Sequence, residues 1–69
     1  MTRLNLLGEN IKKYRTKKEW SQEFLAEKIN LSREYIVRVE KGQKHLSLRK
    51  LFLLADVLEI KLTDLIDFD

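Results

Sequence analysis

Cysteine is absent from this chain of 69 residues, and its only histidine is His45. Without cysteine the chain cannot form a disulfide or a cysteine-ligated zinc finger, and one histidine cannot build a metal site by itself. A Cys–His catalytic pair is impossible for the same reason, and nothing in the sequence indicates a Ser–His–Asp arrangement. We therefore expect no metal, no other cofactor and no enzymatic activity.

Long apolar runs are also missing. No stretch approaches the roughly 18 consecutive apolar residues of a membrane span, and the N-terminal apolar stretch is too short, and too soon followed by charge, for a signal peptide. The length of 69 residues allows one domain at most. A chain this short buries only about 60% of its unfolded surface, so oligomerisation is one route to stability. These features predict one cytoplasmic domain over residues 1–69 with no membrane partner.

Charge is unevenly distributed along the chain. Residues 1–50 hold 13 Lys and Arg against 6 Asp and Glu, a net charge of +7, whereas residues 51–69 hold 1 Lys against 5 acids, a net charge of −4. A basic N-terminal part favours a polyanionic partner, and an acidic C-terminal part does not. A solvated charged surface explains the asymmetry equally well when charge is considered alone.

Proline is absent, glycine occurs only twice, and helix-forming residues dominate, so we expect an all-α chain. Apolar residues at helical spacing predict a first helix over residues 5–17. Serine is a favoured N-cap, because its hydroxyl accepts from an unpaired N–H of the first turn. Ser21, Ser32 and Ser47 therefore predict three further helices, the last of which runs to about residue 58.

Two residues predict helix ends, and one predicts the start of a short last helix. Asn30 and Gly42 both tolerate the left-handed conformation that follows a helix. Thr63 is the expected N-cap of a final helix with the sequence TDLIDF. Asp64 then lies in its first turn, where the helix dipole favours negative charge.

The helices expected after Ser21 and Ser32 are separated by only a few residues, and Ala26 lies in the middle of the first one. A small side chain there lets the second helix cross closely at a steep angle, which is the helix-turn-helix arrangement. The second helix of such a motif enters the major groove of DNA and presents its N-terminal residues to base edges. The motif covers about residues 21–42.

The segment SQEFLAEKINLSREYIVRVEKG resembles the phage-repressor-like (XRE) helix-turn-helix family, as do the preceding NIKKYRTKKEW and the following SLRKLFLLADVLEIKLTDLI. The resemblance covers about residues 5–66. It implies a compact five-helix, lambda-repressor-like DNA-binding domain, and a transcriptional regulator that recognises double-stranded operator DNA by sequence. The family landmarks that lie in register are Gln22, Leu25, Ala26, Ile36 and the Glu40-Lys41-Gly42 ending.

Within this family the chain is most similar to the small controller proteins of restriction–modification systems, which often carry Arg and Tyr where Arg33 and Tyr35 stand. The chain departs from many relatives at Glu19, Asn30 and Glu59, where they have glycine. Asn30 is a chemically sensible replacement. Glu19 and Glu59 are expected to demand a slightly different loop geometry or to carry strain.

The resemblance assigns base recognition to the helix after Ser32. Arg33 is the first candidate, because arginine pairs bidentately with guanine. Arg38 reaches a base or a phosphate, or pairs with Glu34 at i, i+4 spacing, and these roles are compatible. Glu34 accepts from cytosine or simply suits a helix N-terminus. Tyr35 donates to a base or phosphate, or packs its ring beside the preceding helix, and Val37 touches a thymine methyl. The candidate base contacts are Arg33, Glu34, Tyr35, Val37 and Arg38.

Phosphate contacts are expected at both ends of the motif. Gln22 offers its amide and the exposed N–H groups at the start of its helix. The residues after Gly42 lie where relatives grip the DNA backbone, and Ser47 adds its hydroxyl or the N-terminus of its helix. The candidate phosphate contacts are Gln22, Lys41, Gln43, Lys44, His45 and Ser47. Glu40 is instead expected to pair internally, with Arg15 as its candidate partner.

A homodimer is expected, because operator-binding relatives occupy two half-sites about one helical turn apart. The part of the chain from about residue 47 to 69 holds more apolar residues than a monomer core needs. Some of them complete that core, and the rest would form a two-fold self-complementary patch; an apolar monomer surface is the alternative. The candidate dimer residues are Leu53, Val57, Ile60, Leu62, Leu65, Ile66 and Phe68.

A protein-interaction module that keeps the fold without specific DNA binding is the rival hypothesis. It predicts a second helix without basic residues, whereas this one carries Arg33 and Arg38. The expected partners are operator DNA and a second copy of the chain, and RNA polymerase is a further candidate. Because a chain of this length leaves no room for a ligand-sensing domain, we expect control by protein concentration, through dimerisation and autoregulation.

Overall fold

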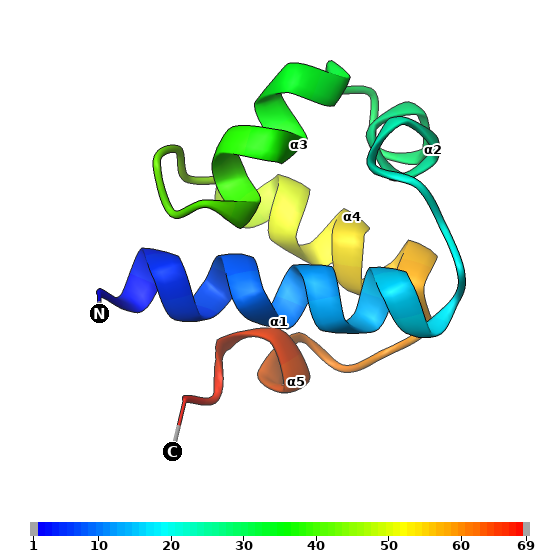
Figure 1. Cartoon of the computed structure of the whole chain (residues 1–69). Coiled ribbons are helices and arrows are strands. Elements are labelled where there is room, and N and C mark those ends of the chain that lie inside the picture. The colour runs from blue at the N-terminus through cyan, green and yellow to red at the C-terminus, as the bar shows by residue number, and fades with distance from the viewer. Residues whose placement is uncertain (1, 69) are drawn as a thin grey trace.

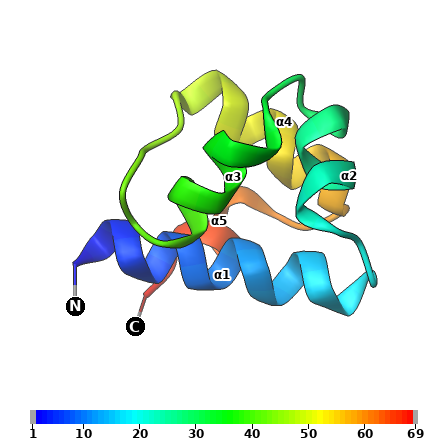
Figure 2. The ribbon, with the colours of Figure 1, turned by 45° about the horizontal axis from the view of Figure 1, so that its top comes forward.

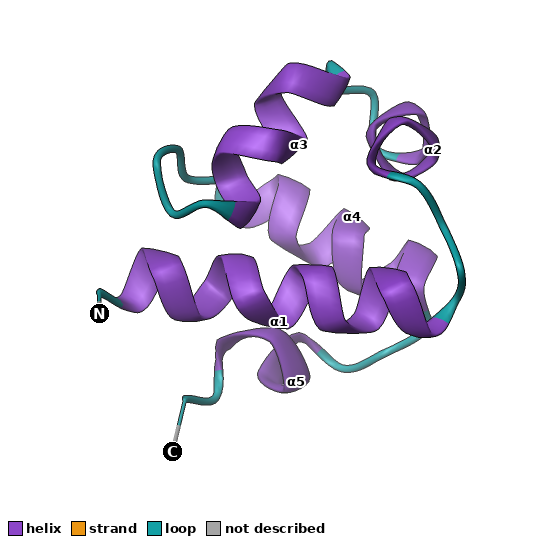
Figure 3. Cartoon of the chain, viewed as in Figure 1, coloured by secondary structure: helices purple, strands orange, loops and turns teal. Residues whose placement is uncertain are grey.

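The computed structural model describes residues 2–68, which form five α-helices and no strand (Figures 1 and 3). This confirms the all-α prediction. The helices are α1 (Arg3–Lys17), α2 (Gln22–Lys28), α3 (Arg33–Glu40), α4 (Leu48–Leu58) and α5 (Leu62–Ile66).

The three serine N-caps are confirmed. The hydroxyl oxygens of Ser21, Ser32 and Ser47 each accept a hydrogen bond from the backbone N–H three residues later, at 3.0 to 3.2 Å. Each bond pairs one of the N–H groups that the first turn of a helix leaves without an internal partner. The starts of α2, α3 and α4 are thus set by local sequence.

Two predicted helix starts are wrong by one or two residues. The first helix begins at Arg3 rather than at residue 5, because the Thr2 hydroxyl accepts from the backbone N–H of Asn5 and the Asn5 Oδ1 accepts from the backbone N–H of Thr2, both at 3.2 Å. The last helix begins at Leu62, so Thr63 is not its cap. There the Asp64 carboxylate accepts from the backbone N–H of Lys61 at 3.0 Å, and this pairing suffices to start the helix.

One apolar core joins all five helices. In Figure 1, α3 and α5 lie on opposite sides of α1, and α4 lies behind α1 and α3. Trp20 is partly buried against this core. The buried core residues are Leu7, Ile11, Leu25, Ala26, Ile29, Ile36, Val39, Leu46, Leu54, Ala55, Leu58 and Leu65.

Helix α1 approaches the end of α3 so closely that only glycine fits at position 8. A Cβ atom at Gly8 would overlap the carbonyl oxygens of Val39 and Glu40. The absence of a side chain here lets the backbones of α1 and α3 come into contact. This contact sets the distance between α1 and the C-terminal end of α3.

Four described residues adopt the left-handed backbone conformation. Asn30 and Gly42 do so with φ of 59° and 76°, as predicted for residues that end helices. Glu19 and Glu59 have φ of 59° and 60°. They therefore keep the geometry that glycine would give and carry the strain of a Cβ in that region.

Among residues 2–68, no helix has the length and apolar character that crossing a bilayer requires.

Candidate nucleic-acid interface

The helix-turn-helix unit is formed by α2, the turn at residues 29–32, and α3. Figure 1 looks along the axis of α2 while α3 extends across the view, and Figure 2 shows α3 in front of α4 with α1 beneath. Ala26 is buried where the two helices meet, as expected for a small residue at a close crossing. Ile36 and Val39 anchor α3 in the core, so the opposite face of α3 is open to solvent.

The exposed face of α3 carries three of the predicted base contacts. Arg33, Glu34 and Arg38 are exposed, and Val37 is half-buried beside them. The Arg38 guanidinium donates to the Glu34 carboxylate at 3.1 Å, which confirms the predicted i, i+4 pair. Both side chains are largely solvated, so the pair is weak and can open for a ligand.

Tyr35 differs from the other candidates on this helix. Its ring is half-buried against the core, and its hydroxyl donates to the main-chain carbonyl of His45 at 2.6 Å. The ring thus packs, as one of the two alternatives held, but its hydroxyl also binds a loop ten residues away. The sequence contains no signal for this bond, because the acceptor is a backbone atom.

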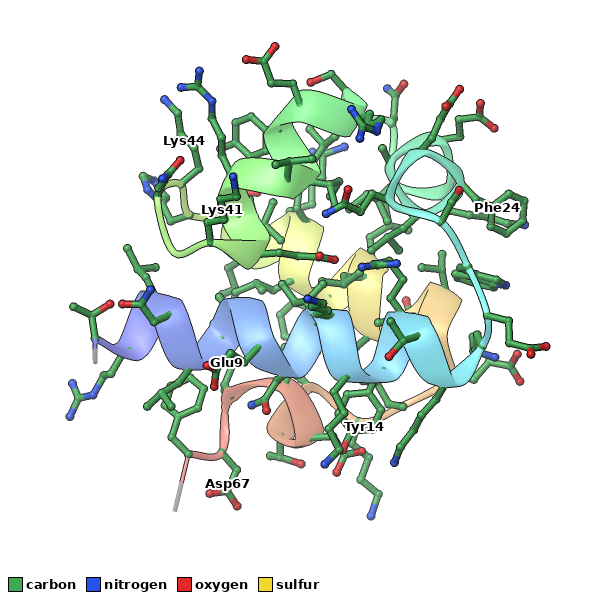
Figure 4. All side chains as sticks on the ribbon, viewed as in Figure 1. Glu9, Tyr14, Phe24, Lys41, Lys44 and Asp67 are labelled. Atoms are coloured by element: carbon green, nitrogen blue, oxygen red, sulfur yellow. The ribbon has the colours of Figure 1, made fainter. Side chains whose placement is uncertain are left out.

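The loop after α3 presents most of the predicted phosphate contacts. Lys41, Gln43, Lys44 and His45 are all exposed, and Figure 4 shows the Lys41 and Lys44 side chains on the same side of α1 as α3. A shallow depression with a volume of ≈ 290 Å³ lies between this loop and the start of α3. It is lined by Ser32, Glu34, Tyr35, Arg38 and Lys44.

The other two phosphate candidates are engaged within the protein. The Gln22 amide nitrogen donates to the Glu40 carboxylate at 3.1 Å, which turns the amide inward. The Ser47 oxygen accepts from the Lys50 backbone N–H. Ser47 keeps its own O–H as a donor, and the start of α2 keeps its exposed N–H groups, because these bonds do not use them.

A buried ion pair holds α3 against α1. The Arg15 guanidinium binds the Glu40 carboxylate through two nitrogens, at 2.7 and 3.0 Å, and donates to the Trp20 carbonyl at 2.7 Å. The two charged side chains are only 10% and 4% exposed. The predicted pairing of Glu40 with Arg15 is confirmed. The part of Gln22 in the same network was not foreseen.

Lys50 makes a contact that sequence reasoning missed. Its Nζ donates to the Ile29 carbonyl at 2.7 Å, in a partly buried position. Ile29 is the C-cap of α2 and the first residue of the turn, and a cation near the end of a helix complements the negative end of the helix dipole. Lys50 therefore ties α4 to the turn of the helix-turn-helix unit.

The predicted dimer residues do not all reach the surface. Leu65 is 0% exposed and completes the monomer core, so its assignment to a dimer is wrong. Leu53 and Ile66 are 36% and 42% exposed. Val57, Ile60, Leu62 and Phe68 are half-buried. Leu48 and Phe52, at 63% and 51%, are the more exposed apolar residues of α4 and were not predicted.

Comparison with known proteins agrees with this architecture. The helix-turn-helix family model matches residues 11–65. A helix-turn-helix-type transcriptional regulator of Archaeoglobus fulgidus is 41% identical over 59 residues, which are 86% of this chain and 84% of that protein. The control protein C.SmaI of Serratia marcescens is 38% identical over 61 residues, which are 88% of this chain and 73% of that protein.

Solved structures extend the likeness to three dimensions. The restriction–modification controller protein C.AhdI from Aeromonas hydrophila superposes with a TM-score of 0.84 at 39% sequence identity, over 90% of this chain and 94% of that one. The two proteins are thus similar in sequence and in the arrangement of their helices over nearly all of both chains. The chain belongs to the helix-turn-helix family of transcriptional regulators, and controller proteins of restriction–modification systems are among its relatives.

Proposed function

We propose that this regulator binds a two-fold symmetric operator as a homodimer, with α3 of each copy in the major groove. The supporting observation is the open face of α3, where Arg33 and Arg38 stand exposed beside the basic loop that contains Lys41 and Lys44. Arginine is the side chain best suited to guanine, and lysines on flanking loops neutralise phosphates.

Each residue class takes a separate part in this proposal. Arg33, at the start of α3, reads guanine N7 and O6, and Glu34 and Val37 contact neighbouring base edges. Arg38 leaves its solvated pair with Glu34 for a base or a phosphate. The side chains of the loop and the N–H groups at the start of α2 set the position on the DNA backbone. The proposed phosphate contacts are Gln22, Lys41, Gln43, Lys44, His45 and Ser47.

The second copy would pack on one flank of α4 and on α5. Leu53 and Val57 share a flank of α4, since residues four apart in a helix are neighbours on its surface. Leu53 and Ile66 are the exposed members of this patch, and the half-buried residues around them complete it. A two-fold axis beside this flank makes the patch self-complementary.

The likeness to controller proteins suggests an autoregulatory role in a restriction–modification system. Dimerisation makes operator occupancy depend steeply on protein concentration. The concentration of the regulator would thus control transcription without a small-molecule effector. A dimer bound upstream of a gene would also meet RNA polymerase there. Such a role places the protein in the cytoplasm with its DNA.

The experiment that tests this proposal is a titration against two duplexes at two salt concentrations. One duplex comes from just upstream of the protein's own gene, and the other is its scrambled counterpart. We expect wild type to prefer the upstream duplex. The Arg33→Ala variant should lose about 1–3 kcal/mol of that preference, because it lacks the bidentate contact to guanine. It should keep salt-sensitive binding to both duplexes, since its phosphate contacts remain.

A different result would favour the interaction module. If wild type shows no preference between the duplexes and almost no salt dependence, the exposed arginines do not serve DNA recognition, and the proposal fails. If Arg33→Ala keeps the full preference of wild type, base recognition lies elsewhere on α3, and the assignment of Arg33 is wrong.

A further inference from the structure

The loop between α3 and α4 is bonded at both ends by side chains from other parts of the molecule. At its start, the Asn5 amide nitrogen of α1 donates to the Lys41 carbonyl at 3.1 Å. At its far end, the Tyr35 hydroxyl donates to the His45 carbonyl at 2.6 Å. The segment from Lys41 to His45 holds four of the exposed residues proposed to face phosphate, and Gly42 among them is half-buried.

Two features of the loop backbone fit this double attachment. Gly42 has φ of 76°, and a Cβ atom there would overlap the Asn5 side chain, so glycine makes room for the amide as well as for the turn. The backbone N–H of Gln43 donates to the Arg38 carbonyl at 2.9 Å. The loop backbone is therefore attached to α1 and α3 by three hydrogen bonds in the absence of DNA.

The Tyr35 hydroxyl has one O–H to donate, and it donates this to the His45 carbonyl. Donating the same O–H to a base would break the hydrogen bond to the loop. The half-buried ring sits against the core, which holds the hydroxyl at the loop.

We propose that Tyr35 and Asn5 are positioning residues, which hold the loop in the shape that grips the DNA backbone, and that Tyr35 is not a base contact. This inference rests on the proposed function, because it concerns how the same surface binds DNA. A loop that is already ordered loses less conformational freedom on binding, so its phosphate contacts yield more affinity. Phosphate contacts carry no direct sequence information, and the benefit is therefore equal for any duplex.

The test uses two variants and two matched controls in the full chain. Tyr35→Phe removes the hydroxyl and keeps the ring; Tyr14→Phe removes a hydroxyl on the other side of α1, away from the loop (Figure 4). Asn5→Ala removes the amide; Thr2→Ala removes the hydroxyl half of the same helix cap but leaves the amide on the Lys41 carbonyl. Each protein is titrated against the upstream and scrambled duplexes, and amide hydrogen exchange is measured for residues 42–46.

Each loop variant should bind both duplexes about 3- to 10-fold more weakly, which is the effect of one lost hydrogen bond. The ratio of the two affinities should stay that of wild type, and exchange at residues 42–46 should become faster than in the controls. Hydrogen exchange reads the attachment of the loop even without DNA. If the wild-type protein did not bind DNA, the proposed function would be refuted, but hydrogen exchange would still show whether Tyr35 and Asn5 hold the loop.

Three results would overturn the inference. A Tyr35→Phe variant that weakens only the upstream duplex would make Tyr35 a base contact. Unchanged exchange in the loop would show that neither bond restrains it. Equal losses in the controls would trace the effect to general stability rather than to the loop.

Discussion

Helices α3 and α4 both leave a broad face uncovered, but the two faces have opposite chemistry. The open face of α3 carries Arg33, Glu34 and Arg38. The open flanks of α4 carry Leu48, Phe52 and Leu53, which are exposed apolar residues. Exposed ion pairs contribute little free energy in water, whereas basic side chains bind a polyanion strongly. Apolar side chains are stabilised by any surface that excludes water. Two helices of one small domain are thus suited to two different partners.

The same contrast appears in how each helix is attached. The C-terminal end of α3 is bound by polar contacts, namely the Arg15–Glu40 ion pair and the Asn5 amide on the Lys41 carbonyl. The inner face of α4 packs through Leu54, Ala55 and Leu58, which are almost completely buried. Polar contacts fix direction as well as distance, while apolar packing tolerates small shifts. Helix α3, which we propose to read base edges, thus has directional bonds at its C-terminal end in addition to the apolar packing of Ile36 and Val39.

The largest expected effect comes from breaking the polar attachment of α3. Replacing Arg15 by methionine leaves the buried Glu40 carboxylate without its cation, and removal of one partner from a buried pair costs about 3–5 kcal/mol. We expect a loss of this size in the free energy of unfolding, measured by urea titration. Because small domains are stable by about 5–15 kcal/mol, part of the population would unfold at 37 °C.

A double variant separates the charge from the packing. Changing both Arg15 and Glu40 to methionine removes the unpaired charge, so it should recover part of the stability lost in Arg15→Met. Recovery should be incomplete, because the Gln22 amide and the Trp20 carbonyl also lose partners. A loss below about 1 kcal/mol in Arg15→Met would mean that water reaches Glu40 and that the buried pair does not hold α3.

A smaller effect is expected on the apolar side, where Leu53→Glu should separate the proposed dimer. A carboxylate in an apolar two-fold patch meets its own copy, and like charges without partners are costly to bury. Loss of joint binding to two half-sites should weaken operator binding by about 100-fold. Analytical ultracentrifugation measures the association, and the upstream duplex measures the binding.

Phe52→Glu is the matched control for that prediction. Phe52 and Leu48, four residues apart, share a flank of α4. Phe52 lies about 100° around the helix from Leu53, and both Phe52 and Leu48 are more exposed than Leu53. If the dimer uses the flank of Leu53, Phe52→Glu should stay dimeric and bind the operator normally. Dissociation by Phe52→Glu alone would move the interface to the other flank, and association unchanged in both variants would contradict the proposed surface.

Local sequence sufficed to predict the parts of the fold that depend on neighbours in the chain. Ser21, Ser32 and Ser47 start their helices as predicted, since capping involves residues three apart. The ion pair of Arg15 with Glu40 was also predictable, because a resemblance to a known family supplied the long-range contact. The burial of Ile36 and Val39, three residues apart on one face of α3, likewise follows local helical geometry.

Contacts that depend on three-dimensional crossings were not predictable. In the sequence, nothing distinguishes Gly8 from an ordinary helix residue, and only the structure shows that α3 contacts its backbone. The partner of the Tyr35 hydroxyl is a backbone carbonyl, which no side-chain pattern marks. In α5, Leu65 is buried and Ile66 is exposed, because successive residues of a helix point about 100° apart and a helix of one turn leaves little periodicity to read.

The smallest expected effect concerns how the two helices end. Helix α3 is followed by Gly42 in the left-handed region, whereas α4 is followed by its C-cap Glu59, with φ of 60°. Glu59→Gly removes the strain of the Cβ but adds freedom to the unfolded chain and breaks the exposed ion pair with Lys18. We expect a net gain of about 0.5 kcal/mol, which raises the melting temperature by roughly 2–4 °C in a domain of this size.

Glu59→Gln distinguishes the two contributions, because it keeps the strained backbone and removes only the charge. It should lower the melting temperature slightly, by the small amount that an exposed pair contributes. If glycine and glutamine instead lower it equally, the ion pair outweighs the strain, and the end of α4 is held by Lys18 rather than weakened by its own backbone. The C-terminal ends of the two helices would then be stabilised differently, α4 by an ion pair and α3 by a glycine in the left-handed conformation.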